Sequence, residues 1–359
     1  MRFESKKFDW VLLLISVLLL SLSVTVIFTG DINTARSQFI FSLLGLSLFF
    51  GVALFDYNMF RLGGRFMYVV IALSLLLVLF IGEEVRGSFR WFVIGPFNVQ
   101  PSELMKPILI LFFSWFASTF SLKSIRILLL SVFLFLLPAL LLFRQPDLGN
   151  VLVYFAIWFA IMVTAGVPRK YLLWGLSFIL LVLPEMWLLL REYQKQRIFS
   201  FLNPYADPLG TGYNVIQSTI AVGSGQLFGR GLGRGTQSRL QFLPEYHTDF
   251  IFATLAEELG FFGSVLLLFL FFFLIFHVFE TARSAPNTFG VFIAVGVGTM
   301  ILFQVCVNVG MNIGIIPITG ITLPLVSYGG SSLLSTLMSL GLVASVFRKK
   351  RQDQALRLQ

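Results

Sequence analysis

Long apolar runs, separated by short polar connections, repeat along almost the whole chain. Ten of these runs have about the 17–25 residues that an α-helix needs to cross a bilayer. They cover Trp10–Thr29, Ser37–Phe55, Phe66–Ile81, Ser102–Phe120, Ile127–Phe143, Val151–Val167, Tyr171–Leu190, Phe250–Phe279, Val291–Val309 and Ser331–Phe347. The pattern predicts an all-α polytopic membrane protein with ten transmembrane helices, in which residues 1–359 form a single membrane domain.

Two connections between the predicted helices are long enough to form loops with structure of their own. The larger is Arg191–Asp249, between the seventh and eighth helices, and the smaller is Gly82–Pro101, between the third and fourth. Aromatic and aliphatic residues recur through the larger loop, whereas a disordered segment would lack them. We therefore expect both loops to be ordered and to lie on the same face of the membrane.

The distribution of Lys and Arg among the short connections predicts the orientation. With the N-terminus inside, the inner connections and chain ends hold 15 of these residues and the short outer connections hold 4. Both termini are thus expected in the cytoplasm, and the large loop 191–249 is expected outside. The first apolar run follows Arg2, Lys6 and Lys7 without a clear cleavage site, so we expect it to be an uncleaved helix.

Composition narrows the class of protein further. Charged residues make up only 12% of the chain and hydrophobic residues 57%, whereas a soluble domain has about 25% charged residues. The net charge of +9 therefore points to membrane lipid and the inside-positive rule, and not to nucleic acid, as its explanation. Cys306 is the only cysteine, and His247 and His277 are the only histidines, so we expect no thiolate or His-rich metal site.

The large loop contains the glycine-rich sequence GRGLGRG at residues 229–235, followed by Arg239. Glycines let a backbone approach phosphate groups closely, and the guanidinium groups of Arg230, Arg234 and Arg239 pair well with phosphates. One interpretation is a binding site for the pyrophosphate of an anionic, lipid-linked substrate. The alternative is a set of glycine turns with solvated arginines.

The large loop ends in His247, Thr248 and Asp249, directly before the eighth predicted helix. A carboxylate at such a junction is able to act as a general base on a sugar hydroxyl, because low-dielectric surroundings raise its pKa. Asp249 is therefore the candidate catalytic residue, with His247 and Thr248 as candidate substrate contacts. The alternative is that Thr248 or Asp249 only caps the helix.

Other ionisable residues fall within or beside the predicted membrane helices. Glu103 and Lys106 have i, i+3 spacing on the fourth helix, which places them on one face. They form either a charged pair that lines a substrate cavity or a structural ion pair at the membrane interface. Asp147 belongs either to a tight polar turn or to the wall of the same cavity. The adjacent Glu257 and Glu258 lie beyond Asp249 on the eighth helix, where a buried carboxylate needs a polar partner.

The segment Asn308–Ser332, between the ninth and tenth helices, is apolar but rich in Gly and Pro. Irregular backbone at membrane depth is tolerated only where protein buries it or where it lines a cavity. We expect a structural re-entrant loop, with direct substrate contact as the alternative. Its structural signature residues are Pro317, Gly320, Pro324, Ser327, Gly329 and Gly330.

Four stretches together resemble one family. The segment NVGMNIGIIPITGITLPLVSYGGSS, the stretch FLPEYHTDFIFATLAEELG, the run GSGQLFGRGLGRGTQ and the sequence QPSELMKP are similar to those of the bacterial shape, elongation, division and sporulation (SEDS) family, the relatives of RodA and FtsW. Within the family, TLAEELG at residues 254–260 is more similar to RodA. The resemblance covers the chain from the fourth helix to its C-terminal end.

The resemblance implies a peptidoglycan glycosyltransferase that polymerises lipid II at the outer face of the bacterial cytoplasmic membrane, for cell elongation and shape. It implies inversion at the reacting sugar carbon and release of undecaprenyl pyrophosphate. The family's essential aspartate falls on Asp249, and its Glu and Lys fall on Glu103 and Lys106. The resemblance also implies a divalent cation, Mg²⁺ or Mn²⁺, for which the sequence shows no recognisable ligands.

A class B penicillin-binding protein, which supplies transpeptidation, is the partner that the resemblance implies. The candidate contacts for it on the eighth helix are Gly260, Gly263, Phe271, Phe272 and Phe273, or else these residues are ordinary lipid-facing or packing surface. The main alternative function is a lipid II flippase, because broken helices and intramembrane charges are also transporter features. The polar residues concentrate at the outer face, which favours the enzyme over a transport path through the whole bilayer.

Overall fold

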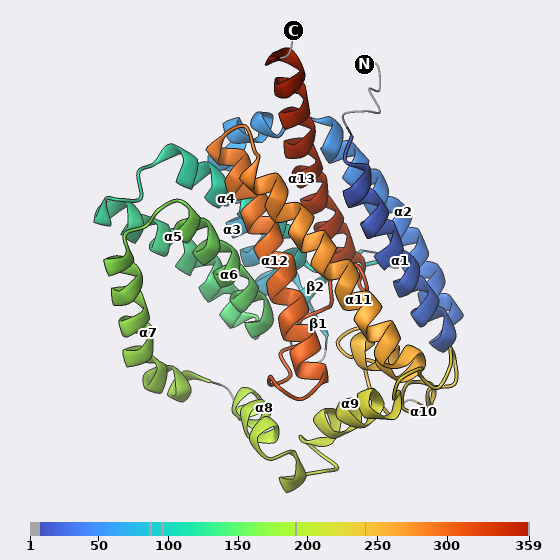
Figure 1. The fold of residues 1–359 in the computed structure, drawn as a ribbon. Helices are drawn as coiled ribbons and strands as arrows, with labels where there is room; N and C mark the ends of the chain where they lie inside the picture. Colours follow the sequence, from blue (N-terminus) through green and yellow to red (C-terminus); the bar gives the residue numbers. More distant parts are fainter. Residues whose placement is uncertain (1–7, 86–87, 95–96, 191, 241, 358–359) are drawn as a thin grey trace.

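A computed structural model describes residues 8–85, 88–94, 97–190, 192–240 and 242–357 of the chain. All ten apolar runs form helices, and all but the seventh pack closely against neighbouring helices (Figure 1). They are α1 (Trp10–Gly30), α2 (Ile32–Leu54), α3 (Gly64–Ile81), α4 (Pro101–Thr119), α5 (Ile125–Arg144), α6 (Leu148–Thr164), α7 (Arg169–Leu189), α11 (Ile251–Arg283), α12 (Thr288–Asn312) and α13 (Gly330–Arg357). A 3-10 helix, η2 (Tyr57–Gly63), leads into α3.

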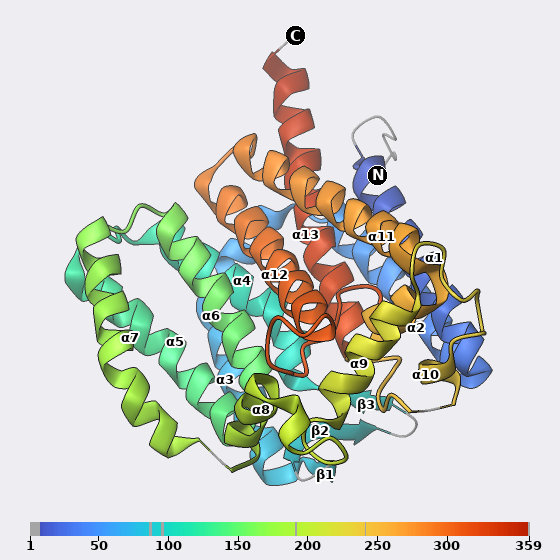
Figure 2. The same ribbon diagram turned by 60° about the horizontal axis from the view of Figure 1, so that its bottom comes forward.

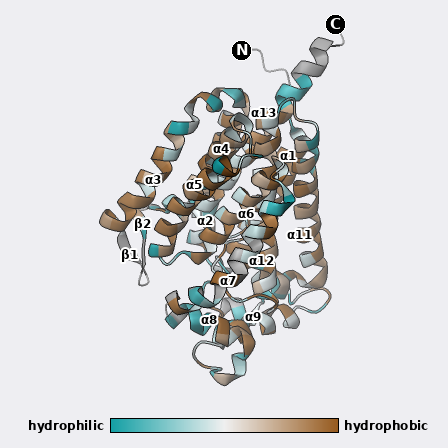
Figure 3. Cartoon of the chain, turned by 90° about the vertical axis from the view of Figure 1, so that its left-hand side faces the viewer, coloured by the Kyte–Doolittle hydropathy of each residue, from teal (hydrophilic) through white to brown (hydrophobic). Residues whose placement is uncertain are grey.

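Among the described residues, seven helices are long and apolar enough to cross a membrane, and α6 is a shorter apolar helix. The chain is therefore a multi-pass membrane protein, while the count of ten crossings stays a prediction. Apolar residues cover the length of the helices, and hydrophilic residues gather toward the two ends of the bundle (Figure 3). The start of α1 and the end of α13 lie at the same end (Figure 1), as expected if both termini are cytoplasmic.

The two long loops lie together at the opposite end of the bundle, as predicted (Figure 2). The smaller loop forms a three-stranded antiparallel sheet of β1 (Glu83–Val85), β2 (Ser88–Ile94) and β3 (Phe97–Val99), with β2 in the middle. The larger loop holds α8 (Glu192–Leu202), the 3-10 helix η3 (Pro204–Ala206), α9 (Tyr213–Ser224) and α10 (Thr236–Arg239). Both loops thus have regular structure, which the recurring aromatic and aliphatic residues predicted.

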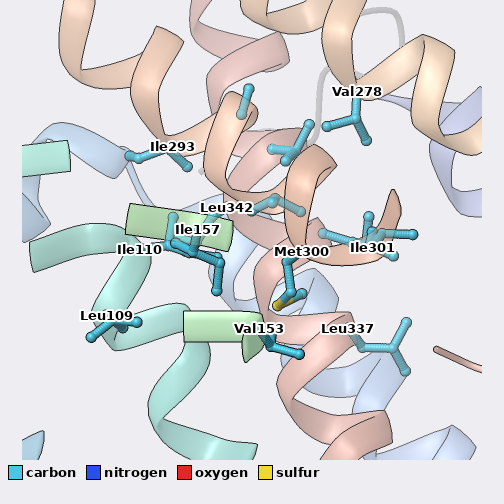
Figure 4. Packing of buried hydrophobic residues seen from close by; sticks show 14 of the residues in the cluster. Leu109, Ile110, Val153, Ile157, Val278, Ile293, Met300, Ile301, Leu337 and Leu342 are labelled. Carbon is cyan, nitrogen blue, oxygen red and sulfur yellow. The ribbon is translucent and has the colours of Figure 1, made fainter. Parts of the chain in front are cut away.

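The core lies where α4, α6, α12 and α13 meet. Side chains from these helices interdigitate there, including Leu109, Ile110, Val153, Ile157, Met300 and Leu337 (Figure 4). Small residues allow α2 and α13 to pack closely: a Cβ added at Gly45 would lie 2.9 Å from Leu333, and one at Gly341 would lie 2.8 Å from the carbonyl oxygen of Phe49. Close backbone approach through small residues is typical of helix packing in membranes.

Candidate functional site

Asp249 lies at the junction between the large loop and α11, where the sequence placed it. The carbonyl oxygen of Glu245 accepts hydrogen bonds from the backbone nitrogens of Thr248 and Phe250, at 3.1 and 3.3 Å, so residues 245–250 form a tight turn. The N-cap position of α11 is Phe250. Neither Thr248 nor Asp249 therefore occupies the cap position that was the alternative interpretation. The side chain of Asp249 is partly buried.

Two asparagines of α12 fix the backbone at Asp249. The side-chain amides of Asn308 and Asn312 both donate to the Asp249 carbonyl oxygen, each at 3.0 Å. Asn308 also donates to the carbonyl of Ile321, at 2.8 Å, and the Asn312 side-chain oxygen accepts from the backbone nitrogen of Ala253, at 3.2 Å. Both asparagines are fully buried. Their hydrogen bonds therefore hold Asp249, the start of α11 and the segment after α12 in one arrangement.

The signature segment, residues 313–329 between α12 and α13, fixes the two residues before Asp249. The hydroxyl of Ser327 donates to the carbonyl oxygen of Thr248, at 2.6 Å, and the backbone nitrogen of Tyr328 donates to that of His247, at 2.7 Å. Three successive carbonyls, from His247 to Asp249, thus accept hydrogen bonds from α12 or from the signature segment. This arrangement leaves the peptide backbone of the candidate catalytic residue little freedom to move.

The signature segment has the irregular backbone that its glycines and prolines predict, because no helix forms between Asn312 and Gly330. Pro324 and Ser327 are buried, and Gly320 has a left-handed φ of 73°. A Cβ added at Gly320 would lie 3.6 Å from Oδ2 of Asp249. Residues 321–327 of the segment are therefore mostly buried in the protein, whereas residues 313–320 are partly or fully exposed. At Gly320 the segment passes directly beside the Asp249 carboxylate.

Glu103 and Lys106 form the ion pair that their spacing predicts. The Lys106 ammonium lies 2.7 Å from both carboxylate oxygens of Glu103, and the two residues are only 2% and 7% exposed. Nearby, Asp147 caps α6 by accepting from the backbone nitrogen of Asn150, and it also accepts from the hydroxyl of Ser102. Asp147 is therefore part of a polar turn that joins α6 to the start of α4.

Residues 319–321 of the signature segment lie between this polar turn and Asp249 and contact both. A Cβ at Gly149, in the first turn of α6, would lie 3.1 Å from the carbonyl oxygen of Thr319 and 2.9 Å from the side chain of Ile321. Gly320, between them, faces the carboxylate of Asp249. The N-terminal turn of α6 and the candidate catalytic carboxylate are thus connected through three residues.

The Gly/Arg loop, residues 225–235, packs against a break in α11. Gly260 has φ 67° and ψ −160°, values that interrupt the helix and that only glycine adopts readily. The break frees backbone groups on both sides of it. The nitrogens of Phe261 and Phe262 donate to the carbonyls of Gln226 and Leu227 in the loop, at 2.8 and 3.2 Å.

Two further backbone hydrogen bonds join the loop to the part of α11 before the break, and here the loop is the donor. The nitrogens of Arg230 and Gly231 donate to the carbonyls of Glu257 and Glu258, both at 3.0 Å. A Cβ added at Gly229 would collide with the Glu258 carbonyl. Four backbone hydrogen bonds therefore join the loop to the helix, and glycine at 229 and 260 permits the close approach.

The carboxylates of Glu257 and Glu258 complete this attachment. Oε1 of Glu257 accepts from the backbone nitrogen of Gln237 at 2.9 Å, and Oε1 of Glu258 accepts from the backbone nitrogen of Gly233 at 3.1 Å and the hydroxyl of Thr29 at 2.7 Å. Both glutamates are buried. The polar partners that these two buried carboxylates need are thus in the large loop and in α1.

The contacts of the Gly/Arg loop correct one expectation. The backbone nitrogens of Arg230, Gly231 and Gly233 donate to Glu257 and Glu258, so they do not form a cradle for phosphate. The side chains of Arg230 and Arg234 are exposed. The side chain of Arg239 lies outside the described part of the structure. A cavity of about 540 Å³ is lined by residues 224–230.

The sequence matches, over residues 6–352, the family of cell cycle proteins named for FtsW, RodA and SpoVE. The chain belongs to this family. Stage V sporulation protein E of Bacillus subtilis is 38% identical, covering 96% of this chain and 98% of that protein. Peptidoglycan glycosyltransferase MrdB of Escherichia coli K12 is 36% identical, covering 96% and 94%.

A solved structure, described as the structural coordination of polymerization and crosslinking by a peptidoglycan synthase complex, contains a similar chain. That chain is 36% identical, with a TM-score of 0.84, and the match covers 96% of this chain and 99% of that one. The FtsW–RodA–SpoVE fold is therefore shared along nearly the whole length. The RodA-like resemblance seen in the sequence is confirmed at the level of this family.

His247 in this family member has a packing environment of its own. Its imidazole lies against the ring of Tyr246, with a centroid distance of 3.7 Å, and its Nδ1 atom is buried without a hydrogen-bond partner among the described residues. Burial lowers the pKa of His247 below its ordinary value of 6.5, although the carboxylates of Glu245 and Asp31 oppose this shift. The imidazole is therefore neutral at neutral pH.

The described residues of this FtsW–RodA–SpoVE protein contain no group of three or more His, Cys, Asp or Glu side chains placed to hold a metal ion. Glu257 and Glu258 are adjacent, but hydrogen-bond donors of the protein occupy one oxygen of each. The carboxylate of Glu103 pairs with Lys106. These carboxylates therefore do not form a ligand set for the divalent cation that the family resemblance implies, and the proposed reaction uses no cation.

Sequence reasoning missed the roles of Asn308, Asn312 and Tyr328. The two asparagines have i, i+4 spacing in NVGMN, which places two amides on one face of an otherwise apolar helix. Polar residues in such a position are expensive unless they have a partner. That signal was available, but only the fold shows that their shared partner is the backbone of Asp249.

Proposed function

We propose that this FtsW–RodA–SpoVE protein polymerises lipid II into glycan strands at the outer face of the bacterial cytoplasmic membrane. The observation that carries the proposal is the fixed backbone of Asp249 at the loop end of the bundle. Three successive carbonyls accept hydrogen bonds from α12 and from the signature segment, and such preorganisation is what a catalytic group requires. The exposed guanidinium groups of Arg230 and Arg234 suit an anionic, lipid-linked substrate.

In the proposed reaction, Asp249 accepts the proton of the 4-hydroxyl of an acceptor GlcNAc as the hydroxyl oxygen attacks the anomeric carbon of a donor MurNAc. A glycosidic C–O bond forms as the bond from that carbon to the pyrophosphate oxygen breaks. Undecaprenyl pyrophosphate leaves with the bonding electron pair, and the anomeric carbon inverts. Guanidinium groups of the Gly/Arg loop stabilise the negative charge that develops on the leaving group.

We also propose a class B penicillin-binding protein as the partner, and elongation and cell shape as the role. The partner proposal draws support from the similar chain in a complex of polymerization and crosslinking. The candidate contact is an apolar groove of about 360 Å³ on α11 and α12, with Leu268, Phe272, Phe276 and Leu302 among its lining residues. An apolar groove in the membrane-spanning part of two helices fits an apolar membrane helix of the partner.

The test uses the full chain with its partner, reconstituted in liposomes that contain fluorescent lipid II. Glycan strands are measured on gels, and movement of lipid II between leaflets is measured by quenching from outside. The transferase proposal expects glycan strands from the wild-type protein. Movement of lipid II without glycan, under conditions where the partner crosslinks added glycan, would instead establish the flippase alternative.

A further inference from the structure

Ser23 of α1 and Gln38 of α2 are completely buried polar residues in otherwise apolar helices. The hydroxyl of Ser23 donates to the carbonyl oxygen of Val326, at 2.6 Å. The side-chain amide of Gln38 donates to the hydroxyl of Ser23 at 3.0 Å and to the carbonyl oxygen of Ser327 at 3.2 Å. Two neighbouring carbonyls of the signature segment are therefore held by side chains from two different helices.

These hydrogen bonds differ from those of other buried serines in the same helices. The hydroxyl of Ser16 in α1 donates to the carbonyl of Leu12, and that of Ser42 in α2 donates to that of Gln38, so each satisfies itself within its own helix. Such intrahelical bonding is the usual solution for a serine in a helix. The hydroxyl of Ser23 instead donates to a segment 303 positions away in the sequence. The need of a buried hydroxyl for a hydrogen-bond acceptor does not explain this choice, because an acceptor within its own helix would meet that need.

The held carbonyls belong to the turn that contacts the catalytic junction. Leu325 has a left-handed φ of 63°, a conformation that a branched side chain adopts only under constraint. Within this turn, the hydroxyl of Ser327 accepts from the nitrogen of Leu323 at 2.8 Å and donates to the carbonyl of Thr248 at 2.6 Å. Ser327 is thus held by Gln38 through its own carbonyl and holds the residue before Asp249 through its hydroxyl.

The geometry points to Ser23 and Gln38 as positioning residues for Asp249, an inference that rests on the function proposed above. They hold the turn of residues 323–328, and the turn holds the backbone of His247 and Thr248. Neither side chain contacts substrate. Their loss leaves the carboxylate chemically intact but less precisely placed, and a displacement of about 1 Å is able to cost about 100-fold in rate.

The structure offers a matched control for each position. Ser23→Ala and Ser16→Ala each delete one buried hydroxyl from α1, but only the first breaks a bond to the signature segment. Gln38→Leu is matched by Gln304→Leu on α12. Both glutamines are buried, and the side-chain oxygen of each has no hydrogen-bond partner among the described residues.

The experiment measures kcat and KM for lipid II polymerisation by the full chain with its partner, together with thermal unfolding in detergent. Ser23→Ala and Gln38→Leu are expected to lower kcat about tenfold or more, with KM changed by less than about twofold. Ser16→Ala and Gln304→Leu are expected to keep the wild-type kcat. Exchange of the backbone amides in residues 323–328 is expected to be faster only in the first two variants.

Two results would overturn the inference. If Ser23→Ala and Gln38→Leu match their controls in kcat, the two residues do not position Asp249. If kcat falls only in proportion to the folded fraction, their role is structural. A wild-type protein that makes no glycan under competent conditions would remove the proposed function itself, and this inference with it, so the two failures are distinguishable.

Discussion

Replacing Gly260 with alanine tests whether the break in α11 holds the Gly/Arg loop. A Cβ at this position would lie 2.7 Å from the carbonyl oxygen of Leu227. Because an ordinary contact begins near 3.4 Å, that oxygen must withdraw by about 0.7 Å. The same oxygen accepts from the nitrogen of Phe262 at 3.2 Å, a length already at the long end for such bonds, so its withdrawal from α11 is expected to break this hydrogen bond.

The remaining attachment is expected to weaken as well. Alanine at the φ and ψ of Gly260 costs about 1–3 kcal/mol in backbone strain. The four backbone bonds between loop and helix contribute about 0.5–1.5 kcal/mol each, or about 2–6 kcal/mol together. Strain of this size offsets a large part of what the attachment contributes, so the loop is expected to detach more often while the helix bundle stays folded.

The assay is limited trypsin digestion of the detergent-solubilised protein, combined with KM for lipid II. Gly260→Ala is expected to speed cleavage after Arg230 and Arg234 and to raise KM, because the guanidinium groups lose their fixed position. Gly223→Ala is the control, since a Cβ there meets nothing within 4 Å. Equal trypsin resistance and equal KM in the two variants would refute the reasoning.

Three further predictions concern stability and positioning. Lys106→Met leaves the buried Glu103 carboxylate unpaired and is expected to lower the free energy of unfolding by about 3–5 kcal/mol, most of which a second change, Glu103→Leu, restores. A double variant that is stable but inactive would place the pair in the substrate cavity. Asn308→Ala and Asn312→Ala are each expected to lower kcat more than they raise KM. The loss of kcat is expected to be larger in the double variant, because either amide alone still holds the Asp249 carbonyl, and an unchanged kcat in the double variant would contradict this role. Because burial lowers the pKa of His247, the unfolded state binds more protons below about pH 6.5, and stability falls as the pH drops through that value toward the pKa in the folded protein. Unfolding temperatures between pH 7 and 5 are therefore expected to vary less in His247→Gln than in wild type, and identical pH profiles would contradict the shift.

Local sequence signals were sufficient for the helices and for one ion pair. Apolar length alone located the ten helices, because a membrane span is a property of consecutive residues. The i, i+3 spacing of Glu103 and Lys106 likewise predicted their contact. Both inferences need only the geometry of a single helix, and no knowledge of which helices are neighbours.

The contacts that hold Asp249 were beyond such reasoning. Asn308 and Asn312 reach its carbonyl across 59 and 63 positions, and the hydroxyl of Ser327 reaches Thr248 across 79. The spacing of these residues within one helix or loop says nothing about a partner so distant in sequence. Their identity as buried polar residues signalled that partners exist, but not which ones.

The Gly/Arg loop shows a different limit. Its glycines indicated a close backbone approach, and that is correct, but the approached group is the Glu258 carbonyl and not a phosphate. Glycine permits close contact with any acceptor, so the partner is decided by the break at Gly260. A glycine inside an apolar helix gives a weak signal by itself, because membrane helices commonly contain glycine for packing.

The measurement that tests the central claim most directly is lipid II polymerisation by Asp249→Asn. Asparagine keeps the shape of the side chain and the held backbone carbonyl, but it does not accept the proton of a sugar hydroxyl. The account predicts that the variant folds and binds its partner like wild type and polymerises at least about 100-fold more slowly. A folded, partner-bound variant that makes glycan at the wild-type rate would contradict the assignment of Asp249 as the general base.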